Sequence, residues 1–124
     1  MEKEISKIDW KNQNCKQIKN LARGLNPGMG AYSNLEDKKI KFWKVEILDF
    51  DSFVNKFSEF EEYKNRIQKI DSGTVLYSDS KEGLFIKGKD GVISVLEIQG
   101  ENAKKMNIKD YLRGNQIISG NRFK

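Results

Sequence analysis

The sequence predicts a small domain of mainly β structure with helices (α+β), folded as a closed or nearly closed β-barrel. Three observations support this prediction. The length of 124 residues suits a single hydrophobic core, short runs rich in β-branched and aromatic residues alternate with turn residues, and two longer stretches have the apolar spacing of a helix. On this pattern alone, a barrel and another α+β arrangement are both open.

The first helix is expected from Asn12 to Gly24, with Pro27 beyond its end. Its apolar residues recur at three- and four-residue steps and therefore share one face: Cys15, Ile18, Ala22 and Leu25. Its cations follow the same period on another face, and these are Lys16, Lys19 and Arg23. The helix should bury one stripe and expose a basic one.

A long strand is expected at 39–48, a segment rich in β-branched and aromatic residues. Ile40 and Phe42 share one phase of the alternation, whereas the apolar residues from Trp43 onward are in the other. Side chains alternate faces along a regular strand, so this change of phase predicts a β-bulge near Phe42 and Trp43. A bulge at this position would bend the strand round a barrel.

The remaining strands are expected at 74–77, 84–87 and 92–98. Asp90 and Gly91 precede the last of them and predict a type I′ hairpin turn, in which both central residues need positive φ. A short helix should follow, capped by Asn107 with Asp110 three residues on, and ending at Gly114. Three apolar residues should then close the barrel: Ile117, Ile118 and Phe123.

Residues 49–71 are expected to form a mainly helical insert that packs on the barrel. Asp51 or Ser52 could cap its start, and its apolar residues keep helical spacing: Phe53, Phe57, Phe60, Ile67 and Ile70. The local charge balance is acidic, so this segment should be the part of the chain least suited to a polyanionic partner.

The chemistry available to the chain is limited. It contains no histidine, which excludes Ser-His-Asp and Cys-His triads and removes the commonest general base and metal ligand. Paired carboxylates such as Glu61 and Glu62 are adjacent on solvated segments. Cys15 is the only cysteine, so we expect a small buried apolar residue rather than a disulfide or zinc ligand. No catalytic residue and no metal site are expected.

Charge and hydropathy bound the partners. The net charge of +5 favours a polyanionic partner, although weakly. The first nine residues alternate charges with isolated isoleucines and lack the apolar segment of a signal peptide. No apolar run approaches the ~20 residues of a membrane helix. We therefore expect a soluble, cytoplasmic protein with no membrane partner.

Four ordered blocks resemble the C-terminal region of methionyl-tRNA formyltransferases. They are residues 8–10 (IDW), 18–33 (IKNLARGLNPGMGAYS), 73–75 (GTV) and 83–114, the last of which runs nearly without a gap against the family's pattern. The resemblance implies an OB-like β-barrel preceded by the N-terminal helix. It also implies that residues 1–10 are the end of an interdomain linker and residues 11–124 the domain, with 49–71 as its insert.

In that family the barrel is joined to an N-terminal catalytic domain, which transfers a formyl group from 10-formyltetrahydrofolate to initiator methionyl-tRNA for translation initiation. The resemblance thus implies a non-catalytic domain that helps bind tRNA, with the cofactor in the catalytic domain in cis and none in this chain. Formyltransferases that act on nucleotide sugars carry a similar barrel, so a structural or dimerisation role in such an enzyme is the alternative. The long 49–71 segment and the glycine-rich residues 28–30 depart from the family pattern.

The candidate RNA contacts are basic, because a module that holds structured RNA mainly by its phosphates needs Lys and Arg. Lys104 and Lys105 come first, since they follow the predicted hairpin and match a basic pair in the family's pattern. The other candidates are Lys16, Lys19, Arg23 and Arg113. For each, the alternative is a solvated surface cation. Four aromatic residues could stack on bases but are expected in the core: Trp10, Trp43, Tyr32 and Tyr111.

Overall fold

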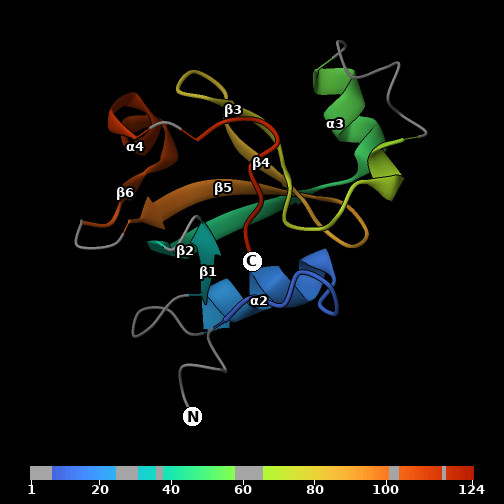
Figure 1. Ribbon diagram of the computed structural model, residues 1–124, viewed down its shortest axis with the longest axis horizontal. Coiled ribbons are helices and arrows are strands. Elements are labelled where there is room, and N and C mark those ends of the chain that lie inside the picture. The colour runs from blue at the N-terminus through green and yellow to red at the C-terminus, as the bar shows by residue number, and fades with distance from the viewer. Residues whose placement is uncertain (1–6, 25–30, 36–37, 58–65, 101–103, 116) are drawn as a thin grey trace.

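The computed structural model describes residues 7–24, 31–35, 38–57, 66–100, 104–115 and 117–124. In these residues the helices are α2 (Cys15–Gly24), α3 (Phe50–Lys56) and α4 (Ile108–Gly114), with a 3₁₀ turn at Ile67–Lys69. The strands are β1 (Ala31–Leu35), β2 (Lys38–Leu48), β3 (Val75–Asp79), β4 (Gly83–Lys87), β5 (Val92–Gln99) and β6 (Met106–Asn107). Figure 1 shows the helices arranged around one sheet. The predicted class, mainly antiparallel β with helices, is confirmed.

The C-terminal segment closes the sheet into a barrel. The strands are ordered β1-β2-β5-β4-β3, all antiparallel, and β6 pairs with β5. The C-terminal segment bonds to both edge strands. At β3, the Val75 N–H donates to the Asn121 carbonyl over 2.7 Å. At β1, Asn34 and Lys124 exchange backbone hydrogen bonds of 3.2 and 2.8 Å. Phe123 is buried as predicted. The prediction that Ile118 helps to close the barrel is wrong, because its side chain is 55% exposed.

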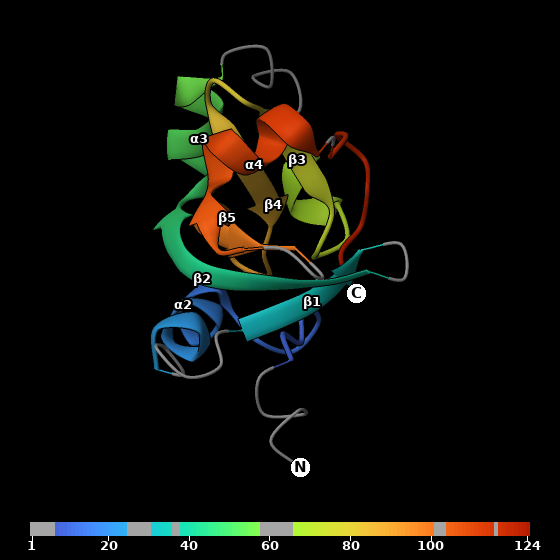
Figure 2. The same cartoon turned by 90° about the vertical axis from the view of Figure 1, so that its left-hand side faces the viewer.

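The bulge predicted in the long strand is confirmed. The register between β2 and β5 shifts between Phe42 and Lys44 and again between Lys44 and Val45. An extra residue on one strand increases the local twist and bends the strand. Figure 2 shows β2 curving round the barrel, so that it pairs with both β1 and β5.

Aromatic rings fill one end of the barrel interior. Trp10, Phe42 and Phe123 lie with their ring centres 5.3 to 6.3 Å apart. The Trp10 indole N–H donates to the buried Ser33 hydroxyl over 2.8 Å, so neither polar atom is left unsatisfied. Ile8 is also buried. Residues 8 and 10 therefore pack within the barrel core, as expected for Trp10, and the linker boundary after residue 10 that the resemblance implies stays a prediction.

The predicted basic helix exists, but its start is at Cys15 rather than Asn12. Asn14 and Gln17 form a reciprocal capping box, with two backbone to side-chain hydrogen bonds of 2.8 Å. The Cys15 N–H donates to the Asp90 carboxylate over 2.9 Å, so the β4–β5 loop caps the helix from a distance. Cys15 is buried as predicted, and burial raises the pKa of its thiol to about 12.

The β4–β5 hairpin is confirmed, but its type I′ turn is not. Lys87 pairs with Val92, which leaves a four-residue loop, and Gly91 is not among the described glycines with positive φ. Its role is close approach, because a Cβ there would lie 2.9 Å from the Leu48 carbonyl oxygen. At Gly88, a Cβ would lie 2.5 Å from the Cys15 sulfur. The two glycines let α2 and β2 reach the loop.

Replacing Asp90 with alanine should lower the free energy of unfolding by about 1 kcal/mol, the usual cost of losing a helix cap. The hydrogen bond from Cys15 lowers the Asp90 pKa, so this stability is present above pH 3.8 and is lost as pH falls through the lowered pKa. Urea unfolding at pH 7 and pH 3 measures both effects. Asp90→Asn keeps an acceptor and should lose less; equal stability of Asp90→Ala and the unchanged chain at pH 7 would contradict the capping role.

Part of the 49–71 segment is helical and packs on the outside of the sheet. The buried residues of this second core are Phe53, Val54, Phe57, Ile67, Leu76, Phe85 and Val92. The helix starts earlier than predicted, because Asp49 is its cap and accepts from the Ser52 N–H, in place of Asp51 or Ser52. Phe60 lies outside the described residues. The insert therefore adds a layer over β3, β4 and β5.

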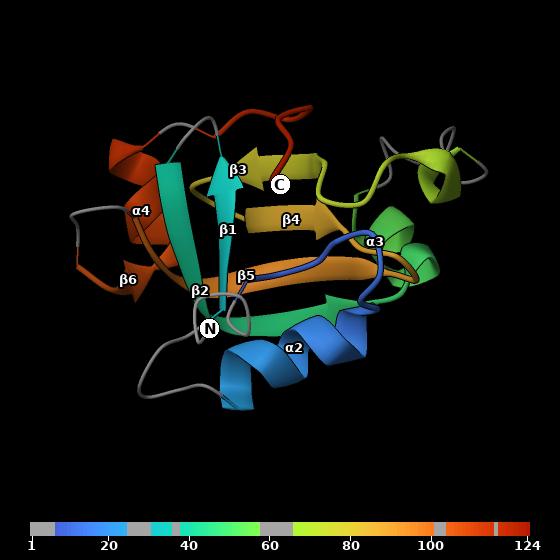
Figure 3. The ribbon, with the colours of Figure 1, turned by 60° about the horizontal axis from the view of Figure 1, so that its bottom comes forward.

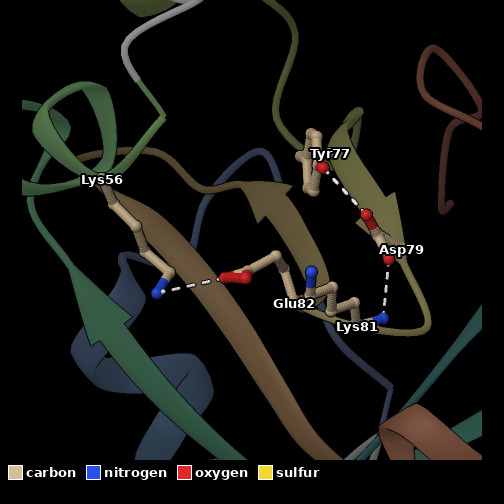
Figure 4. Close-up of polar contacts among 5 residues, drawn as sticks. All are labelled: Lys56, Tyr77, Asp79, Lys81 and Glu82. Atoms are coloured by element: carbon tan, nitrogen blue, oxygen red, sulfur yellow. Dashed lines mark hydrogen bonds and ion pairs between the residues drawn. The ribbon is translucent and has the colours of Figure 1, made fainter.

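Lys56, the last residue of α3, forms an ion pair of 3.4 Å with Glu82 in the β3–β4 turn (Figure 4). Within the turn, the Asp79 carboxylate accepts from the Tyr77 hydroxyl over 2.9 Å and from the Lys81 N–H over 2.6 Å. These hydrogen bonds lower the Asp79 pKa. The turn is thus ordered by its own side chain, and α3 is held to it by a surface ion pair.

Candidate nucleic-acid interface

The cations predicted on the first helix are only partly free. Lys16 is exposed on α2. Lys19 lies on the same helix, but its Nζ is 3.1 Å from the Glu46 carboxylate on β2, which neutralises part of its charge. Arg23 belongs to α2, and its side chain lies outside the described part of the chain. On this helix, Lys16 is the candidate that the structure shows exposed and without an ion pair among the described residues.

Lys104 and Lys105 are exposed immediately before β6. The Lys105 Nζ lies 5.1 Å from the centre of the Trp43 ring, and the Lys41 Nζ lies 5.9 Å from it. The Trp43 indole N–H donates to Gln99 over 2.9 Å. These cation–π contacts place two lysine charges near the Trp43 ring at the bulge. The site is suited to an anion, while Trp43 itself is buried as predicted.

The last candidate is on α4, whose predicted cap is confirmed because Asn107 accepts from the Lys109 N–H over 2.8 Å. Arg113 lies 3.4 Å from Asp110, and both side chains are more than half exposed. Such a surface pair contributes little to stability, but it reduces the charge available to a partner. In Figure 2, α4 and α2 lie on opposite sides of β2. The six candidates therefore do not form one surface.

The other aromatic candidates are mainly structural, as expected. Trp10 and Tyr111 are buried. Tyr32 is half-buried on β1, with the Lys39 Nζ 4.4 Å from its ring centre. None of these rings presents an open face that the structure shows as a stacking platform for bases.

A strongly basic pocket was not predicted from the sequence. It has a volume of about 880 Å³, and its lining contains seven Lys or Arg side chains against two Asp. Six of these cations are exposed: Lys7, Lys11, Lys69, Lys89, Arg122 and Lys124. We call this site the basic pocket. Its lining comes from the segment before α2, residues 69–72, β4 and the β4–β5 loop, and the C-terminal segment.

Both carboxylates of the basic pocket have partners within the chain. Asp9 accepts from the backbone and side chain of Asn12 over 3.2 and 2.9 Å, and these bonds lower its pKa. Asp71 lies 3.4 Å from Arg122. Among the described residues, none of the five exposed lysines has an ion-pair partner. The pocket therefore keeps a net positive charge.

Lys87 is the buried cation of the basic pocket. It is 2% exposed, and its Nζ donates to the Gly88 carbonyl over 2.8 Å and lies 5.4 Å from the Phe50 ring centre. Burial lowers its pKa, because desolvation disfavours the charged form. Of its three N–H donors, one is used in the contacts that the structure describes.

Comparison with known proteins shows the family to which the chain belongs. The model of the formyl transferase C-terminal domain family matches residues 1–116. The chain belongs to this family. A formyl transferase C-terminal domain was the resemblance proposed from the four sequence blocks, and it is confirmed.

The relatives of this formyl transferase C-terminal domain are longer proteins. The methionyl-tRNA formyltransferase of Ruminiclostridium cellulolyticum is 34% identical over 121 residues, which cover 98% of this chain and 34% of the relative. That of Caldanaerobacter subterraneus is 36% identical over 118 residues, which cover 95% of this chain and 32% of the relative. The chain spans about a third of the length of these curated relatives.

Solved structures share the fold. The crystal structure of HypX from Aquifex aeolicus in complex with tetrahydrofolic acid has a TM-score of 0.60 at 12% identity, over 100% of this chain and 21% of that one. A variant of the same protein gives a TM-score of 0.60 at 14% identity, over 95% of this chain and 19% of that one. At this identity the likeness concerns the fold alone.

The described residues contain no group of three or more His, Cys, Asp or Glu side chains that could hold a metal ion. No helix among them has the length and apolar character needed to cross a bilayer.

Proposed function

We propose that this domain helps a methionyl-tRNA formyltransferase bind initiator methionyl-tRNA, while a catalytic domain of the same protein transfers the formyl group. The observation that carries the proposal is the match of nearly the whole chain to methionyl-tRNA formyltransferases at 34 and 36% identity. These relatives are about three times as long, so the rest of the parent protein has room for the catalytic domain and its 10-formyltetrahydrofolate. A role in translation initiation would place the protein in the cytoplasm.

The structure supports a binding role through phosphates. The net charge is +5, and the exposed Lys104 and Lys105 lie beside Trp43 on the outside of the barrel. Structured RNA displays its phosphates and 2′-hydroxyls on its surface, and Lys or Arg contacts them without reading the bases. On this proposal the domain contributes affinity and orientation, and the chemistry takes place elsewhere in the parent protein.

The alternative is a purely structural or dimerisation barrel, as in a sugar-nucleotide formyltransferase. Two of the candidate cations favour it, because Lys19 and Arg113 are engaged by carboxylates of this chain. Salt-dependent RNA binding separates the two functions, because a barrel that only packs on its own enzyme has no reason to release counterions from RNA.

The isolated chain should bind tRNA weakly and in a salt-dependent manner. Each phosphate contact contributes about −0.7 to −0.9 to the slope of log K against log salt, and affinity should be no better than about micromolar at physiological salt. Changing Lys104 and Lys105 to Glu should reduce the slope by about one to two. Fluorescence anisotropy of labelled tRNA from 25 to 200 mM salt (~1 decade) measures this.

The matched control is Lys44→Glu with Lys81→Glu, which makes the same charge change at two other exposed lysines. It should leave the slope nearly unchanged. If both double variants lose the same affinity, the Lys104 and Lys105 contacts are refuted. If the unchanged chain shows no salt-dependent tRNA binding at low salt, the structural alternative replaces the proposed function.

A further inference from the structure

We infer that the basic pocket binds a phosphate group of the RNA backbone and is the main RNA anchor of this domain. This inference rests on the proposed function and makes it more specific. It differs from the contacts expected from the sequence, since Lys104 and Lys105 precede β6 at the opposite end of the barrel from the segment before α2 and the β4–β5 loop (Figure 3).

The density of positive charge favours the pocket as the anchor. Seven cations line a pocket of about 880 Å³, whereas two lysine Nζ atoms lie 5.1 and 5.9 Å from the Trp43 ring centre. The lining also contains two carboxylates, of which Asp71 pairs with Arg122, so five of the seven positive charges are not compensated within the pocket. A concave site lined by charges of one sign concentrates the field and attracts counterions more strongly than a convex surface does.

The cations of the pocket come from several segments that the barrel holds together. Lys11 precedes α2, Lys69 ends the 3₁₀ turn, Lys89 is in the β4–β5 loop, and Lys124 follows Phe123. The hydrogen bonds that close the barrel hold these segments together. Gly73 N–H donates to the Lys87 carbonyl over 2.7 Å, and Phe123 N–H donates to the Gly73 carbonyl over 2.8 Å. These backbone hydrogen bonds therefore hold together segments that carry the cations.

Lys87 is the buried cation in the wall of the pocket, with its side chain almost fully enclosed. Burying an ammonium group costs free energy that an apolar residue would not. The Asp71 and Asp90 carboxylates offset part of that cost. A bound phosphate would offset more of it by supplying further counter-charge.

The position of the pocket also favours this role. Lys7 and Lys11 line the pocket, so the segment that precedes α2 runs along the edge of the pocket. On the proposed function, the catalytic domain precedes this point in the parent protein. A phosphate held in the basic pocket would therefore lie where the barrel connects to that domain, which suits an RNA shared between the two.

The test measures the affinity of the whole 124-residue chain for labelled tRNA at about 50 mM salt. Lys69→Glu with Lys89→Glu changes two exposed residues from different walls of the pocket. A lost phosphate contact removes about 0.8 from the salt slope, which corresponds to roughly tenfold in affinity between 1 M and 50 mM salt. We expect affinity to fall about 10- to 100-fold, more than for Lys104→Glu with Lys105→Glu, while the Lys44 and Lys81 control changes little.

Lys87→Met is the second variant, because it keeps an unbranched side chain about as long as the aliphatic part of lysine and removes the charge. We expect it to bind tRNA about tenfold more weakly and to unfold at no lower urea concentration than the unchanged chain. Burial lowers the Lys87 pKa below its unfolded value, so the charge opposes folding at neutral pH. If Lys87→Met instead loses stability and keeps tRNA affinity, the residue is structural and the inference is overturned.

The outcomes separate this inference from the function on which it rests. If the pocket variant loses no more affinity than the control while Lys104→Glu with Lys105→Glu still weakens binding, the inference fails and the proposed function stands. If the unchanged chain does not bind tRNA at about 50 mM salt, the inference and the proposed function both fail. Titration with pyrophosphate provides the last arm. Loss of pyrophosphate binding in the pocket variant with unchanged tRNA affinity would mean that the pocket takes a free phosphate ligand, which also overturns it.

Discussion

Phe53→Ala is expected to lower the free energy of unfolding by about 3 to 5 kcal/mol, the range for removing a buried phenylalanine. Phe53 is fully buried, and its ring centre lies 5.1 Å from that of Phe57 and 5.7 Å from that of Phe85. Truncation would remove contacts with both rings and leave a cavity between α3 and the sheet. Urea unfolding followed by far-ultraviolet circular dichroism measures the loss.

Ile118→Ala is the control for Phe53→Ala, because this apolar side chain is 55% exposed and should contribute less than about 0.5 kcal/mol. A loss below about 1 kcal/mol for Phe53→Ala would mean that α3 is not anchored to the sheet. The result bears on function as well. Lys69 follows this layer along the chain and belongs to the basic pocket, so loosening the layer should also weaken binding there.

Local patterns predicted most elements, since each depends on residues close in sequence. The capped helix at Asn107 and the bulge at Trp43 both follow from neighbouring residues. The failures involve distant contacts. Gly91 is needed because β2 passes over it, and Asp90 caps a helix 75 positions away. Neither relation leaves a trace in a short window of sequence.

The basic pocket escaped prediction for the same reason. Its lysines come from segments as far apart as residues 7 and 124, and each is an ordinary surface cation in its own segment. A local signal was present at Arg122 and Lys124, which flank the buried Phe123 in the alternation of a strand. That alternation places two cations on the face opposite the core. The acidic balance of 49–71 pointed away from Lys69, because a net charge over a segment does not reveal where single side chains lie.

Trp10→Ala is expected to lower the free energy of unfolding by about 3 to 5 kcal/mol, although the resemblance implies that residues 1–10 are the end of a linker. Trp10 is 5% exposed, its ring centre lies 6.2 Å from that of Phe42 and 6.3 Å from that of Phe123, and its N–H donates to Ser33. The variant would lose the packing of one end of the barrel and leave the buried Ser33 hydroxyl without its partner. Urea unfolding monitored by circular dichroism measures the change, because fluorescence would be altered by the loss of the indole.

Trp10→Phe is the milder variant, since it keeps one aromatic ring and removes the hydrogen bond together with part of the ring volume. It should lose about 1 to 2 kcal/mol. Because Trp10 and its neighbours Asp9 and Lys11 line the basic pocket, Trp10→Ala should also weaken tRNA binding under conditions where the protein is still folded, whereas Ile118→Ala should not. On this view the folded domain begins at or before Lys7, and the lysines at the point of entry belong to the binding site. Should Trp10→Ala cost less than about 1 kcal/mol, the segment is a linker and the boundary after residue 10 stands.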